Sequence, residues 1–398
     1  MAMTINTNVV SINAQRNLGL SGNSLATSMQ RLSSGLRVNS AKDDAAGLAI
    51  AERMSTQVRG LSVASRNAND GISLAQTAEG ALGKVGDMLQ RMRELAVQSG
   101  NATNSKSDRE ALQSELSQLR DEVDRVAKTT SFNGAKLLDG GFTGAVFQVG
   151  ANSGDNITVG ALANTKVDEL GNSTYGKAAD VTAATVKTQA QASISAGDVT
   201  IKITGSNGTE TSVKIAKDAN VTEDEALGKV VAAINSKTAD TGVTAFLSDD
   251  KTKIELRATE NQANGDDIAN VKIDTGSSIA AVDVTAGAAT AGGGKGIDQV
   301  DISTQSGAWE ALQRIDKAID KVNSSRGDLG AIQTRFEKSV ENIDIQSENI
   351  TAARGRITDA DFAKETANLS RTQILQQAGT AMVAQANQLP QQVLSLLR

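Results

Sequence analysis

The chain ends with the stretch LSRTQILQQAGTAMVAQANQLPQQVLSLLR, residues 369–398. Leucine, methionine and leucine recur in it at seven-residue intervals, and an alanine lies between the first two. This spacing predicts an apolar seam along one side of a helix whose other sides are mostly uncharged and polar. The predicted seam and the apolar end that follows it comprise Leu375, Ala378, Met382, Leu389, Val393, Leu396 and Leu397. Because chain ends are usually polar, an apolar end predicts a partner that is distant in sequence or on another molecule.

The first forty residues carry a matching pattern. Leu18, Leu25 and Leu32 are seven residues apart, and Met29 and Leu36 each follow four residues after one of them. We expect the two seams to bury each other in an antiparallel helix pair that joins both ends of the chain. A helix pair leaves much of each helix uncovered, so the weakly charged outer faces predict packing against further copies. An ordinary intramolecular coiled-coil face is the alternative interpretation.

Three more segments show apolar residues spaced by three and four. They are residues 61–99, residues 108–128 after a capping box of Ser107 and Glu110, and residues 308–350. The last would form a rod of roughly 65 Å. Residues 43–60 are interpreted as a link, and Thr358 with Asp361 as a cap for the terminal helix. The pattern predicts a long antiparallel helical bundle.

Short apolar runs around turn signals predict β-structure. Asn133-Gly134 and Asp139-Gly140 indicate β-hairpins that follow the second bundle helix. Farther along, residues 199–203 and 212–215 flank Asn207-Gly208, Thr222 and Glu225 cap a short helix, and residues 243–247 and 253–258 form a strand pair. This second group predicts a small α+β domain inserted into the helical body.

The predicted fold class is therefore mainly α, a long antiparallel helical bundle or coiled coil built from both chain ends, with β-hairpins and an inserted outer α+β domain. We expect residues 1–42 and 356–398 to form a terminal coiled-coil domain. Residues 43–172 and 298–355 would form the bundle domain with its hairpins. Residues 173–297 would form a variable, surface-exposed α+β domain.

The composition argues against an enzyme. The chain has 398 residues, no cysteine and no histidine, so disulfides, thiol nucleophiles, thiolate metal sites and the usual general base are excluded. The adjacent carboxylates of Asp43 and Asp44 are interpreted as a helix-start or solvated pair. No glycine-rich phosphate-binding motif is present. We expect no catalytic residue, no cofactor and no metal site.

The charge pattern and hydropathy also restrict the partners. The net charge is −6, and acidic and basic residues are interspersed without a basic stripe, so no nucleic-acid partner is expected. No stretch reaches the roughly 20 apolar residues of a membrane span. The first residues lack a basic region followed by an apolar run, which argues against an ordinary secretory signal.

Both ends of the chain resemble bacterial flagellin, the subunit of the flagellar filament. The resemblance rests on MAMTINTNVVSINAQRNL, LATSMQRLSSGLRVNSAKDDAAGLAIAERM and the terminal stretch quoted above, and it covers residues 1–170 and 298–398. It implies a homopolymer in the form of a helical filament, outside the cell, exported through the flagellar type III apparatus. It also implies an export chaperone, cap proteins and junction proteins as partners.

The segment QRMRELAVQ, residues 90–98, is similar to the flagellin segment recognised by animal toll-like receptors. The resemblance implies that Arg91, Leu95 and Glu115, with Gln90 beside them, form a surface used for receptor recognition and for contacts between subunits. From the residues alone, an ordinary charged helix face is the simpler interpretation.

Two other functions are compatible with the pattern. A hook–filament junction protein of the same superfamily would also have paired helical ends, although the match over the last thirty residues argues against it. A secreted adhesin would bind a ligand through its middle domain without polymerising. Seeded self-assembly of the purified chain separates these alternatives from a filament subunit.

Overall fold

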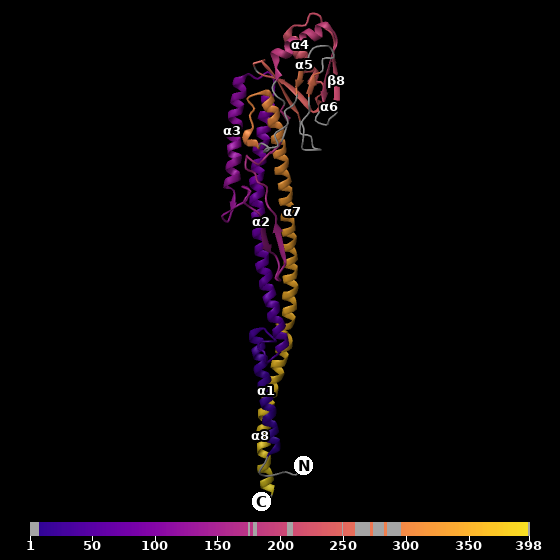
Figure 1. Ribbon diagram of the computed structural model, residues 1–398. Coiled ribbons are helices and arrows are strands. Elements are labelled where there is room, and N and C mark those ends of the chain that lie inside the picture. The colour runs from indigo at the N-terminus through magenta and orange to yellow at the C-terminus, as the bar shows by residue number, and fades with distance from the viewer. Residues whose placement is uncertain are drawn as a thin grey trace. The chain divides into compact units, whose positions relative to one another are not determined.

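The computed structural model describes residues 8–173, 176–177, 181–204, 210–248, 250–258, 271–273, 282–284 and 296–396 (Figure 1). The helices are α1 (Val9–Ser34), α2 (Ala45–Ser99), α3 (Lys106–Thr129), α4 (Ala183–Ala196), α5 (Glu223–Asn235), α6 (Thr238–Thr241), α7 (Gln305–Thr358), α8 (Phe362–Leu396) and the 3₁₀ helix η1 (Ile297–Gln299). The strands are β1 (Ser131–Phe132), β2 (Ala135–Lys136), β3 (Ala145–Gln148), β4 (Asn156–Val159), β5 (Gly176–Lys177), β6 (Val181–Thr182), β7 (Val199–Thr204), β8 (Glu210–Ile215), β9 (Val243–Leu247), β10 (Lys253–Ala258), β11 (Val271–Ile273) and β12 (Val282–Val284). The fold is mainly helical, as the sequence predicts.

The chain divides into two compact units. The first consists of Met1–Asp70, Phe147–Ile157 and Phe336–Arg398, and the second of Gly71–Val146 and Thr158–Arg335. Helices α2 and α7 each contribute a segment to both units.

In the first unit, α1 runs beside α8 (Figure 1). Helix α1 begins after Asn8, whose side chain accepts a hydrogen bond from the Ser11 amide at 3.0 Å. It ends at Gly35, which adopts φ +71° and donates its amide to the Arg31 carbonyl. This left-handed cap favours glycine, and it ends the helix at Ser34, within the predicted terminal segment of residues 1–42.

Helix α2 corrects the predicted link over residues 43–60. The helix is continuous from Ala45, because the Asp44 carboxylate accepts a hydrogen bond from the Gly47 amide at 2.8 Å and so satisfies one of the first free amides. Asp43 closes the preceding turn by accepting bonds from the Asn39 and Ser40 amides. Both carboxylates of the Asp43–Asp44 pair thus serve local backbone geometry.

In the same unit, the N-terminal part of α2 packs against the C-terminal part of α7. Leu61 and Ala64 of α2 share a small buried cluster with Ile343 of α7. Phe147 of β3 meets Phe336 of α7 edge to face, with ring centroids 5.4 Å apart. Apolar packing therefore holds the hairpin strand on the helices here.

In the second unit, α2, α3 and α7 form the expected antiparallel bundle. Its fully buried side chains include Leu82, Val85, Leu89, Met92, Leu116, Val123, Val322 and Leu329. The capping box of α3 is formed by Ser105 and Asp108 rather than by the predicted Ser107 and Glu110. The prediction was wrong by two residues because Lys106 already starts the helix and Ser107 lies within its first turn.

The turn signals before β3 have different outcomes. Asn133 and Gly134 adopt φ +47° and +82° and connect the antiparallel strands β1 and β2, as predicted. Asp139-Gly140 forms a bend in which the Asp139 carboxylate accepts a hydrogen bond from the Gly141 amide. The hairpin predicted there was wrong, because β3 pairs with β4. Strands β3 and β4 have four residues each.

The inserted part of the second unit has the predicted α+β character. Strand β7 pairs with β8, and β9 pairs with β10, both antiparallel. The capping box of Thr222 and Glu225 starts α5 as predicted. Asn207-Gly208 lies outside the described residues. Helix α4 was not predicted, because its sequence is rich in Ala, Thr and Gln and has little apolar periodicity.

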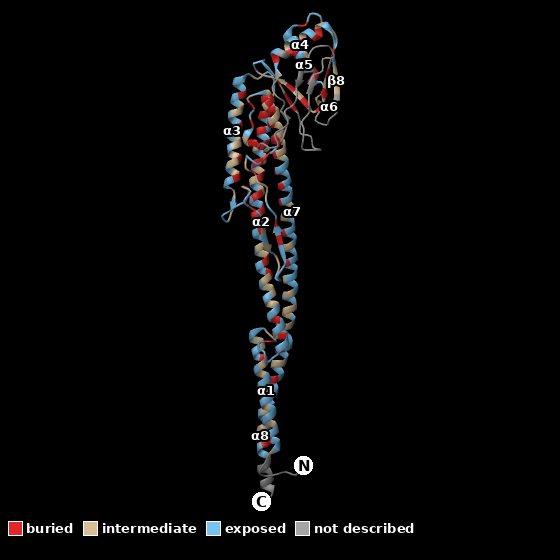
Figure 2. Ribbon diagram, viewed as in Figure 1, coloured by how far each residue is buried: buried red, intermediate tan, exposed pale blue. Residues whose placement is uncertain are grey.

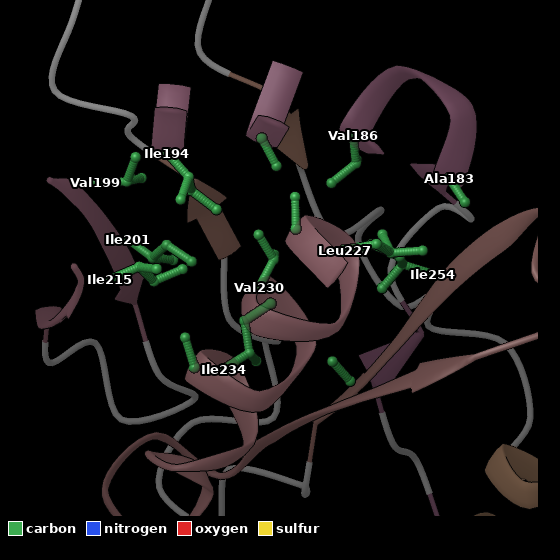
Figure 3. Packing of buried hydrophobic residues seen from close by; sticks show 14 of the residues in the cluster. Ala183, Val186, Ile194, Val199, Ile201, Ile215, Leu227, Val230, Ile234 and Ile254 are labelled. Atoms are coloured by element: carbon green, nitrogen blue, oxygen red, sulfur yellow. The ribbon is translucent and has the colours of Figure 1, made fainter. Parts of the chain in front are cut away.

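The core of this inserted part is apolar throughout (Figure 3). Side chains from α4, α5 and the strands meet in it, including Ile194, Ile201, Leu227, Ile234 and Ile254. Figure 2 shows buried residues concentrated here and in the bundle of the second unit, whereas α1 and α8 are mostly exposed.

Candidate assembly surface

Polar contacts between the first turn of α1 and the late part of α8 fix the direction and register of the α1–α8 pair. The Asn8 side-chain amide donates to the Ala386 carbonyl at 2.7 Å, and the Ser11 hydroxyl donates to the Asn387 side chain at 2.7 Å. The first turn of α1 therefore lies beside the late part of α8. The two helices are antiparallel, as the sequence predicts.

An ion pair marks the other end of the pair. Arg31 of α1 lies 3.1 Å from Glu365 of α8, and the Glu365 side chain is almost completely buried. Asn368 donates to the same carboxylate at 2.9 Å. The hydrogen bond from Asn368 and the bond and charge of Arg31 lower the pKa of Glu365 against the opposing effect of burial.

Small residues recur on the face of α8 that meets α1. Thr372, Gly379 and Ala386 are seven residues apart and lie buried or half-buried. A Cβ added at Gly379 would lie 3.0 Å from a terminal methyl of Leu18, so the helices approach closely at this point. Small side chains allow this close approach because they take up little space between the two helix backbones.

This arrangement corrects part of the predicted seam. Leu375 and Met382 lie three residues after Thr372 and Gly379 and point away from α1, with 49% and 63% of their surface exposed. The prediction that these two side chains bury the N-terminal seam was wrong, because helical pairing was inferred from large apolar residues alone. Ala378 is exposed as well.

The N-terminal residues of the predicted seam behave differently. Leu18, Leu25 and Leu32 are half-buried along α1, and Leu36 is half-buried in the link after it. Met29 lies outside this stripe and is 56% exposed. The predicted positions Leu389, Val393, Leu396 and Leu397 lie where the structure describes no side chains.

The α1–α8 pair thus exposes apolar side chains on both helices. Those in the described part are Val9, Val10, Ile12, Leu20, Met29, Phe362, Ile374, Leu375 and Met382. By contrast, the buried side chains of the two helices in that part are Ser11, Ser28, Glu365, Thr372 and Ala386. A helix pair whose buried positions are mostly polar, and whose outer faces carry exposed apolar side chains, is suited to being covered by other molecules.

Backbone contacts connect the two links that precede α2 and α8. The Arg37 guanidinium donates to the Ile357 carbonyl at 2.7 Å, and the Ala360 amide donates to the Gly35 carbonyl at 2.9 Å. Leu36 and Asp359 form an isolated antiparallel bridge. The apolar pattern of the sequence could not predict this contact between the links, because backbone groups form most of its hydrogen bonds.

The second predicted surface lies on α2 and α3. Arg91 donates to Glu115 at 2.8 Å and to Glu94 at 2.9 Å, and all three side chains are about half exposed or more. The bonds to Glu94 and Glu115 raise the pKa of Arg91. Gln90 is exposed too.

Leu95 does not belong to that surface. Its side chain is completely buried in the bundle, so the expectation that it is presented with Arg91 and Glu115 was wrong for the folded chain. The heptad position of Leu95, three residues after the buried Met92, accounts for this, since both fall on the inner face of α2.

A charged cluster lies where β10 meets α7 in the second unit. The Nε of Arg257 lies 2.5 Å from Glu310 Oε1, and its Nη2 lies 3.0 Å from Glu255. Arg314 lies 3.9 Å from Glu310, and both arginines are buried. They border a polar cavity of about 270 Å³. Opposite charges balance in pairs here, which fits a structural joint.

Within the described residues, no group of acidic side chains is arranged to hold a metal ion. In the same part of the chain, no helix is long and apolar enough to span a bilayer.

Family models match most of the helical body. Residues 5–143 match the bacterial flagellin N-terminal helical region, and residues 312–397 match the C-terminal helical region. Residues 200–260, in the inserted part, match the flagellin hook IN motif.

Individual relatives agree with these matches. The chain is 42% identical to flagellin B of Vibrio cholerae and 39% identical to B-type flagellin of Pseudomonas aeruginosa, with complete coverage of both chains in each case. It is 28% identical to the solved FliC of Burkholderia pseudomallei, over 67% of this chain and 99% of that one, with a TM-score of 0.39. The chain therefore belongs to the bacterial flagellins, the secreted structural subunits of the extracellular flagellar filament.

Proposed function

We propose that the α1–α8 pair is the polymerisation element of this flagellin, and that it reaches its stable form when neighbouring copies cover it. The observation that carries the proposal is the contrast between its seam and its outer faces. The buried residues in the described part of the pair are Ser11, Ser28, Glu365, Thr372 and Ala386, which provide little apolar stabilisation, while large apolar side chains of both helices are exposed. Folding of the pair is thus coupled to assembly.

The proposal also assigns each remaining segment a place in the filament. Residues 1–42 and 356–398 form the inner core, and residues 43–172 and 298–355 form the bundle that contacts neighbours along and between protofilaments. Residues 173–297 face outward. Head-to-tail contacts that do not close into a ring generate a helical filament, which serves as a propeller for motility.

Family membership also supports a route and a set of partners. The chain is exported through the flagellar type III apparatus, guided by its N-terminal segment, with an export chaperone bound to the C-terminal helix. Cap and junction proteins then contact it at the two ends of the filament.

Recognition by a host toll-like receptor is the second proposed role, and it uses the exposed groups Gln90, Arg91 and Glu115. Exchange of the charged pair, R91E with E115R, tests it. The exchange preserves the ion pair between positions 91 and 115 and loses the bond to Glu94, so the melting temperature is measured in parallel. A receptor reporter should still respond if only bundle stability matters. Loss of the response with an unchanged melting temperature would support direct recognition, whereas a full response would contradict it.

Seeded assembly tests the main proposal. Purified chain is mixed with filament fragments and followed by light scattering and negative-stain microscopy, beside a sample that lacks residues 369–398. We expect long uniform filaments from the intact chain and none from the truncated one. Equal polymerisation of both, or a monomeric intact chain, would contradict the proposal.

A point variant refines this test. Leu375→Gln with Met382→Gln removes two outward-facing apolar side chains without touching the seam with α1. Gln377→Ala, at an exposed polar position of the same helix, is the matched control. The double variant should assemble poorly and the control normally.

A further inference from the structure

We propose that Met29 and Met382 are oxidation-sensitive sites that control assembly: conversion of their thioethers to sulfoxides in the free subunit prevents its addition to the filament. This inference rests on the proposed role of the α1–α8 pair. It assigns these two side chains a chemical role beyond that of apolar contacts.

The exposure of the two side chains singles them out. Met29 on α1 is 56% exposed and Met382 on α8 is 63% exposed. Among the other methionines in the described part of the chain, Met92 is fully buried in the bundle, and Met54 and Met88 are half-buried. Because oxidation of methionine requires access to sulfur, Met29 and Met382 should react first.

Their surroundings determine the consequence. Met382 follows the exposed Leu375 by seven residues, so both lie on one outward stripe of α8. On α1, Met29 lies beside the half-buried stripe formed by Leu18, Leu25 and Leu32, and its own side chain remains exposed. Neither side chain contributes to the buried seam, so oxidation alters the outer faces and leaves the pairing of α1 with α8 in place.

The chemistry requires a two-electron oxidant such as a peroxide. The sulfur attacks the distal oxygen of hydrogen peroxide, the O–O bond breaks, and the S–O bond forms. After proton transfer, one water molecule leaves, and the sulfur has lost two electrons while the peroxide has gained them. The product replaces an apolar group by a polar S=O group, which must be desolvated without a partner when a neighbouring copy covers it.

The experiment compares assembly before and after oxidation. Free subunits are treated with hydrogen peroxide, the peroxide is removed, and elongation is measured from untreated filament fragments. The test variant is Met29→Leu with Met382→Leu, since leucine has similar volume and helix propensity and cannot be oxidised in this way. The matched control is Met54→Leu with Met88→Leu, which keeps both proposed sites.

Oxidised wild type and oxidised control should each show a critical concentration raised about tenfold or more. The oxidised test variant should elongate like its untreated form. Treatment of the oxidised wild type with methionine sulfoxide reductases should restore elongation. Far-ultraviolet circular dichroism of the free subunit should change little.

Normal elongation of the oxidised wild type would overturn the inference, as would equal failure of the oxidised test variant. A second measurement is independent of variants: peptide mass spectrometry after peroxide treatment of intact filaments and of free subunits. Oxidation of Met29 and Met382 should be much slower in filaments, and equal rates would overturn the inference. Failure of untreated wild type to elongate would instead count against the proposed polymerisation element.

Discussion

The inserted α+β part and the α1–α8 pair bury very different material. The core of the inserted part contains Ile194, Ile201, Ile234 and Leu256, each at most 2% exposed. In the described part of the α1–α8 pair, the buried positions are two serines, a threonine, a glutamate and one alanine. Since burial of apolar surface supplies most of the free energy of folding, the inserted part should be stable within one subunit.

The pair should depend on other copies for the same reason. It has long helices and a defined register, but many of its large apolar side chains are exposed. Figure 2 shows most residues of α1 and α8 as exposed. We therefore expect the inserted part to be stable within one subunit and the stability of the α1–α8 pair to depend on the concentration of other copies. Four substitutions separate these behaviours.

The largest effect is expected at the charged joint of the inserted part. Glu310→Leu would leave Arg257 and Arg314 buried without their shared carboxylate. Removing one partner of a buried ion pair costs about 3–5 kcal/mol, and the lower end of this range is expected because Arg257 keeps its bond to Glu255. Trp309, the only tryptophan of the chain, lies 6.5 Å from Phe246 at this joint, so its fluorescence during urea unfolding reports the loss directly.

The companion variant is Glu310→Leu with Arg257→Met, which removes both members of one ion pair, while Glu255 and Arg314 keep their charges. Replacing a buried ion pair by apolar groups is often tolerated, so part of the lost stability should return. Filament assembly by the single variant should remain, because the joint lies outside α1 and α8. An unchanged urea midpoint for the single variant would show that the pair contributes little.

A cavity in the apolar core should have the next largest effect. Ile234 of α5 is completely buried in the cluster of Figure 3, and Ile234→Ala should lower the free energy of unfolding by about 2–4 kcal/mol. Val231→Ala, at a partly buried position of the same helix, should cost less. The Trp309 transition checks both, and similar losses for the two variants would contradict the assignment of the core.

Much of the fold could be predicted from the sequence where local chemistry determines the structure. The Thr222–Glu225 capping box, the Asn133-Gly134 turn and the strands over residues 243–247 and 253–258 occur as predicted. Each depends on side chains within a few residues of one another. The spacing of Leu18, Leu25 and Leu32 likewise gives the stripe along α1.

Other features depend on which neighbours a helix meets. The apolar pattern places Leu375 and Met382 on the seam because they are large and apolar, whereas α1 packs on small residues that allow close approach. The family resemblance places Leu95 on a surface, but three-helix packing buries it. A seven-residue spacing shows which residues share one face of a helix, but it does not show which face packs against the neighbouring helix.

The close approach at Gly379 gives the third prediction. Gly379→Leu would force a large side chain against Leu18, whose methyl group would lie only 3.0 Å from the new Cβ, and overpacking of this kind costs about 1–3 kcal/mol. We expect a raised critical concentration for assembly and an unchanged Trp309 transition. Gly379→Leu with Leu18→Ala should recover part of the loss, and failure to recover any would place the defect elsewhere.

The smallest effect is expected at Glu365, and it depends on pH. Its pKa is lowered in the folded pair by Asn368 and then by Arg31, so the bonds stabilise the pair above the unfolded pKa of about 4.3. This stability is lost as the pH falls through the lower folded value. Because Arg31 is about one-third exposed, the ion pair should contribute no more than about 1 kcal/mol.

Glu365→Gln keeps a hydrogen-bonding group of the same size and removes the titration. Filaments of the variant should depolymerise at slightly lower temperature than wild type at pH 7, and the difference should shrink as the pH is lowered through about 4 and below. The Trp309 transition, which reports the inserted part, should show the same pH dependence in both proteins. A difference between the two proteins that stays constant across this pH range would mean that Glu365 acts through packing rather than through its charge, and the α1–α8 pair would then be held without an ionic contribution at that end.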